Sequence, residues 1–266
     1  MRREKGIVWP LLIGVVALGV GAAAAASALT QGAAAGTTHG EWVKYAKPGT
    51  KDTIRAYVAY PERKDKAPAV IVIHEVYGLT DWEPTVVDRL ANNGFVAIVP
   101  DLLSSKHGRS PANPDSGRKL IGELEPARVT ADLDATYAWI GAQPAVASER
   151  IGVIGFCWGG GQSFRYATNN PKLRAAVVCY GPTPGEGLDR IKSPILGVYG
   201  EDDARINQSL PATDAEMKKL GKRFDRTIYP ATGHGFLKPG RKGNDGPEPK
   251  RAWEDIVSFY RGQLGK

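Results

Sequence analysis

The strongest constraint on the fold comes from one glycine-rich stretch, residues 150–161, which reads RIGVIGFCWGGG. Its first half is an apolar, β-branched run, and such runs bounded by glycine predict a buried strand. A G-x-C-x-G pattern centred on Cys157 follows. This is the cysteine form of the nucleophile elbow, in which a nucleophile sits on a sharp turn between a strand and a helix. The flanking residues must be small because the backbone there is strained, and the helix N-terminus favours a thiolate. The same pattern also fits an inert buried cysteine, so it needs partners elsewhere in the chain.

Apolar runs and amphipathic segments alternate along the rest of the sequence. Strands are predicted at residues 69–73, 95–99, 174–179, 194–199 and 225–229, and helices at 82–93, 126–140, 158–168, 207–220 and 253–264. This alternation predicts βαβ units, and therefore an α/β fold with a mostly parallel central sheet and helices on both faces. Residues 41–46 and 53–60 alternate in polarity and predict an antiparallel hairpin at a sheet edge. We expect a long loop beside the site at 102–122 and a surface loop at 238–250.

Composition narrows the class of protein. The chain has 266 residues, 42% of them hydrophobic, which suits one sizeable core and a single domain. The net charge is +7, but the basic residues are scattered and form no long block. Nucleic-acid binding is therefore not expected, and the charge supports only a mild preference for anionic substrates. The histidines are dispersed, which argues against a metal site.

The N-terminus has the layout of a secretory leader. A short basic segment precedes an almost entirely apolar one, and Ala26, Ser27 and Ala28 form a small-residue cleavage site of the A-x-A kind. Residues 1–28 are predicted to be a signal peptide, or an N-terminal membrane anchor if they are not cleaved, because the apolar run is long enough to span a bilayer. Residues 29–40 are expected to be a linker and 41–266 the folded domain. An exported location, periplasmic or extracellular, follows from either alternative.

Two cysteines in an exported chain raise the question of a disulfide. Cys179 ends the apolar run 175–178, which is predicted to be a core strand, and free cysteine is commonly buried. We therefore expect Cys157 and Cys179 to be free thiols.

A cysteine nucleophile needs a base and a group that orients the base. The order of such groups in this kind of fold is nucleophile, acid, histidine. Asp202 and Asp203 follow the predicted strand 194–199, and His234 follows the last strand in a glycine-flanked loop. We favour Asp203 as the acid and Asp202 as a turn or capping residue. A structural turn histidine remains the alternative for His234.

The other histidines are poorer candidates for the site, whereas one more carboxylate is a good one. His39 lies in the predicted linker and His107 in a loop, and His74 is expected to point away because neighbouring strand residues face opposite ways. Glu75 ends the strand 69–73, in the loop that supplies an oxyanion N–H in this fold. A solvated carboxylate at a strand end is the alternative for Glu75.

Five stretches together carry a resemblance to a known family. They are IVIHEVYGL at 71–79, VPDL at 99–102, GFCWGG at 155–160, GEDD at 200–203 and YPATGHGF at 229–236. In this order they resemble the dienelactone hydrolase family, which has the α/β-hydrolase fold. The resemblance covers everything after the leader and is far more specific than any one motif.

The resemblance implies a catalytic triad of Cys157, His234 and Asp203 that forms a thioester intermediate. It also implies that Glu75 contacts the resting thiol and that the backbone N–H groups of Val76 and Trp158 form the oxyanion hole. The implied activity is hydrolysis of a small ester or lactone, of the carboxymethylenebutenolidase type, by a monomer without a cofactor. The alternatives are a broad-specificity carboxylesterase and an exported binding protein that has kept the fold without turnover.

One departure from the family concerns substrate recognition. Lactone-degrading members carry an arginine after the Pro-Asp-Leu stretch and another after the catalytic histidine, and both hold the substrate carboxylate. Neither arginine is in place here. Lys106, Arg109 or Lys238 could substitute for them, or each could be a solvated loop charge.

Overall fold

The apolar runs pair into one eight-stranded sheet in the computed structural model, which describes residues 38–265. Its strand order is β1-β2-β4-β3-β5-β6-β7-β8. The strands are β1 (His39–Ala46), β2 (Thr53–Tyr60), β3 (Ala67–Ile73), β4 (Val96–Pro100), β5 (Val146–Phe156), β6 (Ala175–Cys179), β7 (Ile195–Gly200) and β8 (Phe224–Tyr229). β2 pairs antiparallel with both of its neighbours, β1 and β4. All the other neighbouring strands pair in parallel.

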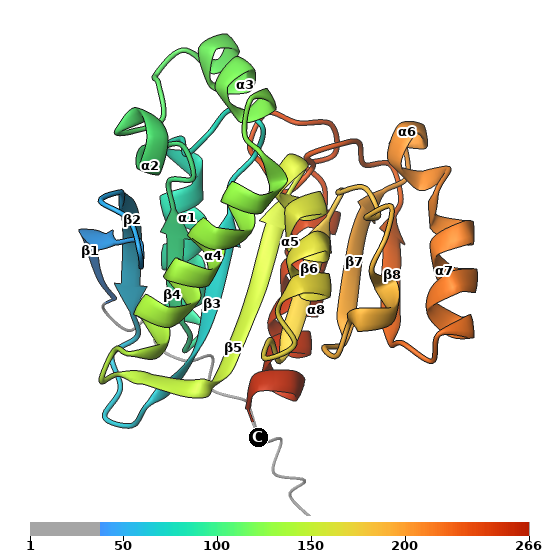
Figure 1. Ribbon diagram of the computed structural model, residues 1–266. Coiled ribbons are helices and arrows are strands. Elements are labelled where there is room, and N and C mark those ends of the chain that lie inside the picture. Colours follow the sequence, from blue (N-terminus) through green and yellow to red (C-terminus); the bar gives the residue numbers. More distant parts are fainter. Residues whose placement is uncertain (1–37, 266) are drawn as a thin grey trace, which may run out of the picture. The chain divides into compact units, whose positions relative to one another are not determined.

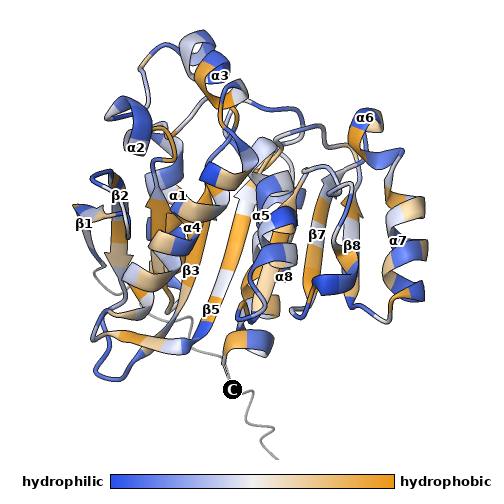
Figure 2. Ribbon diagram, viewed as in Figure 1, coloured by the Kyte–Doolittle hydropathy of each residue, from blue (hydrophilic) through white to orange (hydrophobic). Residues whose placement is uncertain are grey.

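Helices cover both faces of the sheet, as the sequence predicted (Figure 1). They are α1 (Trp82–Asn92), α2 (Ser104–His107), α3 (Pro114–Gly122), α4 (Pro126–Gly141), α5 (Trp158–Asn169), α6 (Ala204–Asn207), α7 (Leu210–Lys219) and α8 (Glu248–Leu264), with a short 3-10 turn η1 (Leu188–Arg190). One buried cluster joins the sheet to α4 and α5, and the other joins it to α1 and α8. Apolar residues concentrate along the central strands (Figure 2).

The central strands are apolar throughout because both of their faces are covered. Every residue of β3 and of β4 is buried. The amphipathic helices turn their apolar stripes to the sheet, as α1 does with Val86, Val87 and Leu90. The sheet thereby becomes a rigid frame, and the loops at its carboxyl edge can hold reactive groups in fixed positions.

The predicted edge hairpin is confirmed, with Ala46 opposite Thr53 where β1 and β2 meet. β1 begins at His39, so the last two residues assigned to the linker belong to the sheet. The predicted leader, 1–28, lies outside the described residues. No helix within residues 38–265 is long and apolar enough to cross a membrane.

The long loop predicted at 102–122 was wrong in part. It contains α2 and α3. Asn113 caps α3 by accepting a hydrogen bond from the Ser116 N–H at 2.9 Å, and Pro114 follows at the first helical position. This Asn-Pro signal is a standard helix start, but the glycine and polar residues around it obscured the helical period. Similarly, α8 begins at Glu248 rather than at 253. The helix predicted at 207–220 corresponds to α7, which begins at Leu210 and follows the short helix α6.

Candidate active site

Cys157 occupies the turn between β5 and α5 in a conformation that few residues adopt. Its φ is 58° and its ψ is −116°. A positive φ on a residue with a side chain costs about 1–3 kcal/mol and is found mainly at functional sites. The Cys157 N–H donates to the carbonyl of Cys179 at 3.0 Å, and the Cys157 carbonyl accepts from the Gly160 N–H at 3.0 Å. These bonds hold the turn so that the thiol faces a cavity.

Glycines beside Cys157 are required by close backbone approach. A Cβ on Gly155 would lie 1.8 Å from the carbonyl oxygen of Gly159. A Cβ on Gly159 would lie 2.3 Å from the carbonyl oxygen of His74, at the end of β3. Both positions therefore exclude any side chain. The first turn of α5 thus rests directly on the end of the neighbouring strand.

Asp203 and His234 come from the loops that follow β7 and β8. The two strands pair through Gly200 and Tyr229, and their loops remain joined where the Asp202 N–H donates to the Thr232 carbonyl at 2.8 Å. Within this frame, His234 Nδ1 donates to Asp203 Oδ2 at 2.5 Å. The Asp203 side chain is only 6% exposed. The structure therefore places Asp203, the favoured acid, beside His234.

Asp202 points elsewhere. Its carboxylate pairs with the ammonium group of Lys242 at 2.6 Å, and both side chains are largely exposed. This arrangement agrees with the turn role predicted for Asp202.

The proton affinity of His234 is set by opposing effects. Burial alone lowers the pKa of His234, but the hydrogen bonds to Asp203 and Cys157, together with the charges of these two groups, outweigh it and raise the pKa from 6.5 to about 9. A ring that holds its proton at neutral pH and is hydrogen-bonded to the sulfur has the properties that a general acid needs.

Two backbone N–H groups near the thiol have no hydrogen-bond partner within residues 38–265. They belong to Trp158, the first residue of α5, and Val76, in the loop after β3. The first N–H groups of a helix have no acceptor inside the helix. Cys157, Trp158 and Val76 all line the same cavity. An oxyanion hole requires unpaired donors of this kind beside the nucleophile.

Glu75 forms an ion pair with Lys238, and it lines the same cavity as Cys157, the thiol that the family resemblance assigns to it. The Lys238 ammonium donates to Glu75 Oε2 at 2.7 Å, and the two side chains are 19% and 4% exposed. Lys238 also lies over the rings of Tyr77 and Trp82. The ion pair satisfies a carboxylate that burial would otherwise penalise. Lys238 is therefore not a solvated loop charge, whereas Lys106 and Arg109 are exposed.

The cavity around Cys157 has a volume of about 480 Å³. Three arginines that the sequence analysis did not single out line it, and they come from α3, α6 and the loop before α8: Arg118, Arg205 and Arg241. The Arg118 guanidinium donates to the hydroxyl of Tyr77 at 3.0 Å. A hydrogen bond to the same tyrosine raises the pKa of Arg241; burial opposes this increase, and the charge of Glu75 adds to it. The mouth of the cavity is therefore strongly cationic.

Tyr180 lines the same cavity and has a buried hydroxyl. Its side chain is fully buried, and its hydroxyl oxygen has no hydrogen-bond partner among the described residues. Its ring packs edge-on against His234 with centroids 5.2 Å apart, and its φ is 40°. Buried hydroxyls without partners are rare in folded proteins.

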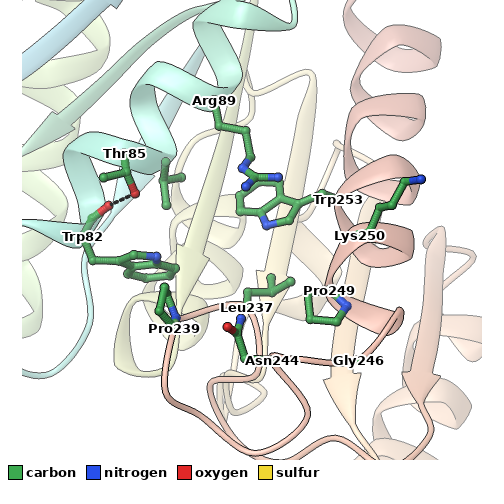
Figure 3. A pocket seen from close by; sticks show the side chains of 11 residues that line it. Trp82, Thr85, Arg89, Leu237, Pro239, Asn244, Gly246, Pro249, Lys250 and Trp253 are labelled. Atoms are coloured by element: carbon green, nitrogen blue, oxygen red, sulfur yellow. Dashed lines mark hydrogen bonds between the residues drawn. The ribbon is translucent and has the colours of Figure 1, made fainter.

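A second hollow of about 370 Å³ lies between α1 and α8 (Figure 3). Figure 3 shows Trp82 on one side, and Arg89 against the ring of Trp253 on the other. No cysteine or histidine lines this hollow. The reactive groups thus gather in the Cys157 cavity.

Both cysteines are free, as predicted. Within residues 38–265 no group of three or more His, Cys, Asp or Glu side chains could hold a metal ion.

The profile of the dienelactone hydrolase family matches residues 54–264. The chain belongs to this family. The match spans β3 to β8 and nearly all of β2, the elbow, and both loops that carry Asp203 and His234. Membership agrees with the resemblance seen in the sequence motifs and makes the protein a hydrolase of the α/β fold.

Related proteins and a solved structure agree with this family assignment. A Salmonella typhimurium protein named "Putative carboxymethylenebutenolidase" is 30% identical over 234 residues, which cover 82% of this chain and 86% of that protein. A Saccharolobus solfataricus protein of the same name is 31% identical, over 82% and 96%. The crystal structure of a "Putative Dienelactone Hydrolase" from Klebsiella pneumoniae superposes with a TM-score of 0.76 at 27% identity, covering 84% of this chain and 98% of that chain.

Sequence reasoning missed the three arginines because they lie in segments without periodicity. Arg118 sits in the stretch that was expected to be a loop, and Arg241 in the surface loop before α8. Only Arg205 had a signal, since it follows the favoured acid Asp203 by two residues.

Proposed function

We propose that the protein hydrolyses small esters or lactones through a thioester on Cys157. The observation that carries the proposal is the strained turn that presents Cys157 to a cavity shared with His234, whose Nδ1 is held by Asp203. This is the geometry of a nucleophile, a proton carrier and an orienting acid.

In the first half of the reaction, the Cys157 thiolate attacks the carbonyl carbon and the carbonyl oxygen becomes an oxyanion. The N–H groups of Val76 and Trp158 donate to it, and each such donor is worth roughly 3–4 kcal/mol of transition-state stabilisation. The carbon–oxygen bond then breaks. The leaving oxygen takes the proton from Nε2 of His234, and the acyl group remains on sulfur as a thioester.

In the second half, His234 acts as a base. The thioester sulfur carries no charge, so the part of the pKa increase that comes from Cys157 disappears and the pKa of His234 falls from about 9. The ring then accepts a proton from water, and the hydroxide attacks the thioester. The acid product leaves, and the sulfur returns as a thiolate beside the protonated ring.

The cationic mouth supports a substrate that carries a carboxylate. Arg118, Arg205 and Arg241 place guanidinium groups around the cavity, and a guanidinium matches a carboxylate with two parallel donors. The family's usual arginine positions are vacant here, so these three groups would supply the recognition from other elements. The relatives' names point to the same kind of substrate, an acidic lactone.

The test is a comparison of two activated esters, p-nitrophenyl acetate and the p-nitrophenyl monoester of succinic acid. We expect both to be hydrolysed, with a KM about tenfold lower for the succinate ester, and neither by Cys157→Ala. Equal KM values would favour a broad-specificity carboxylesterase. Labelling of the thiol without turnover of either ester would favour the non-catalytic binding protein and contradict the proposal.

We also propose that the protein is exported, on the strength of the leader motif in residues 1–28. The mass of the protein recovered from the producing cells tests this. Loss of about 28 residues indicates cleavage after Ala28, and a full-length protein in the membrane fraction indicates an anchor. A full-length protein in the cytoplasm contradicts export.

A further inference from the structure

His74 follows β3 and is completely buried. Its side chain does not line the Cys157 cavity, in agreement with the expectation that it points away from the site. Two hydrogen bonds nevertheless connect its ring to the backbone around the cavity. Nδ1 lies 2.9 Å from the carbonyl oxygen of Glu75, and Nε2 lies 3.2 Å from the backbone nitrogen of Leu102.

These partners fix the position of the proton on the ring. The Leu102 N–H can only donate, so Nε2 of His74 is the acceptor. The Glu75 carbonyl can only accept, so Nδ1 carries the hydrogen. The ring therefore bridges the end of β4 to the Glu75 carbonyl with one donor and one acceptor, both used.

The orientation of the Glu75 carbonyl determines where the next N–H points. The described backbone contains no cis peptide bond, and in a trans peptide the C=O and the following N–H point in opposite directions. Because the Glu75 oxygen is held towards the His74 ring, the N–H of Val76 points away from it. Val76 lines the cavity, and its N–H is the unpaired donor described above.

The neighbouring contacts hold the same loop. The Glu75 carbonyl also accepts from the Gly78 N–H at 3.3 Å, and the Glu75 N–H donates to the buried carboxylate of Glu83 at 3.4 Å. The His74 bond is the shorter of the two bonds to the carbonyl. Without the His74 bond, the Glu75 carbonyl would keep only the longer of its two hydrogen bonds, which lies within a turn.

The His74 ring also contacts the other donor residue. It stacks on Trp158 with centroids 5.7 Å apart and an angle of 17° between the planes. The backbone of Gly159 packs against the His74 carbonyl, so closely that a Cβ on Gly159 would lie 2.3 Å from its oxygen. One residue therefore touches the elements that supply both N–H groups.

We propose that His74 is a positioning residue that aims the Val76 N–H at the oxyanion. The inference rests on the proposed function, since it concerns the same reaction. It assigns to His74 no contact with substrate and no proton transfer. Its effect is confined to steps in which a carbonyl oxygen acquires charge.

Two substitutions separate the two hydrogen bonds of the ring. In His74→Asn the side-chain amide nitrogen can take the place of Nδ1, which preserves the donor to Glu75. In His74→Gln the amide oxygen can take the place of Nε2, which preserves the acceptor for Leu102 and removes the donor to Glu75. The two variants have similar polarity, so each serves as the control for the other.

Two reactions of Cys157 are then measured in wild type and both variants. The first is acylation, followed as the burst of nitrophenolate from an activated ester, which forms an oxyanion. The second is alkylation by iodoacetamide, which displaces iodide at a saturated carbon and forms none. Loss of a whole oxyanion-hole donor costs on the order of 100–1,000-fold in rate, and a misdirected donor costs less.

We expect His74→Gln to acylate about 10–100-fold more slowly than wild type and His74→Asn within about threefold of it, with alkylation unchanged in both. The proposal is overturned if His74→Gln acylates at the wild-type rate, if both variants lose acylation equally, or if alkylation falls in parallel. A wild-type protein that releases no nitrophenolate, either in a burst or in steady-state turnover, refutes the proposed function instead. If either variant fails to fold, the nitrogen chemical shifts of His74 in the wild-type protein decide: a proton on Nε2 contradicts the proposal.

Discussion

His234 and Asp203 come from loops after different strands, yet Nδ1 of the histidine donates to Oδ2 of the aspartate at 2.5 Å. The distance is at the short end for a charge-assisted hydrogen bond. The pairing of β7 with β8 brings the two loops together. The hydrogen bond to Asp203 fixes the His234 ring so that Nε2 is available to Cys157 and to the leaving group.

The first prediction concerns this pair. Asp203→Asn removes the charge that helps to raise the pKa of His234 to about 9, and it can favour the wrong ring tautomer. We expect kcat to fall on the order of a thousandfold. In wild type, kcat/KM should decline as the pH rises through about 9, because His234 loses the proton that the leaving oxygen needs. In the variant that decline should begin at lower pH.

Asp202→Asn is the matched control, since Asp202 pairs only with the exposed Lys242. It should keep the wild-type rate and the wild-type alkaline limb. If the two asparagine variants had the same rate and pH profile, the assignment of Asp203 as the orienting acid would be wrong.

The second prediction concerns the ion pair between Glu75 and Lys238. Lys238→Met leaves a carboxylate that is 4% exposed without its partner, and breaking a buried pair from one side costs about 3–5 kcal/mol. Denaturant unfolding should register a loss of that order. The double variant Glu75→Gln/Lys238→Met should recover most of the loss, because neither charge is then buried alone.

Lys250→Met controls for the substitution itself, because the Lys250 side chain is 84% exposed. Its free energy of unfolding should change by less than about 0.5 kcal/mol. Equal destabilisation by the two single methionine variants would show that the Glu75 pair contributes nothing particular.

The third prediction uses two tyrosines whose buried hydroxyls have no hydrogen-bond partner within residues 38–265. Tyr180 lines the catalytic cavity, and Tyr199 packs in the core beneath α5 and α7. Replacing either with phenylalanine should not lower the free energy of unfolding, because no hydrogen bond is lost. Both variants should keep kcat/KM close to the wild-type value, because the ring that packs against His234 is retained and the buried hydroxyl is not exposed to substrate. A large loss of kcat/KM in Tyr180→Phe alone would contradict this and would assign the hydroxyl a part in the reaction.

The sequence was sufficient for the parts of the site that depend on strand order. The elbow around Cys157 has a steric signature, and Asp203 and His234 follow strands whose apolar runs are unambiguous. Parallel strands end at a common edge, so the three residues had to approach one another.

The remaining parts depend on packing between segments that lack such signatures. The pairing of Lys238 with Glu75 joins residues 163 positions apart and was not predictable from either neighbourhood. Arg118 and Arg241 reach the cavity only because α3 and the loop before α8 fold over the sheet edge. His74 was correctly predicted to point away from the cavity. Its hydrogen bonds to the backbone could not be predicted from the sequence.

The most direct test of the central claim is the intact mass of the protein during turnover of an activated ester. The account predicts a transient increase equal to one acyl group, located by peptide mapping on Cys157. The adduct should persist in Cys179→Ala, because the thiol removed there is buried in β6. It should be absent from Cys157→Ala. Undiminished ester hydrolysis by Cys157→Ala, or an acyl group mapped to another residue, would contradict the account.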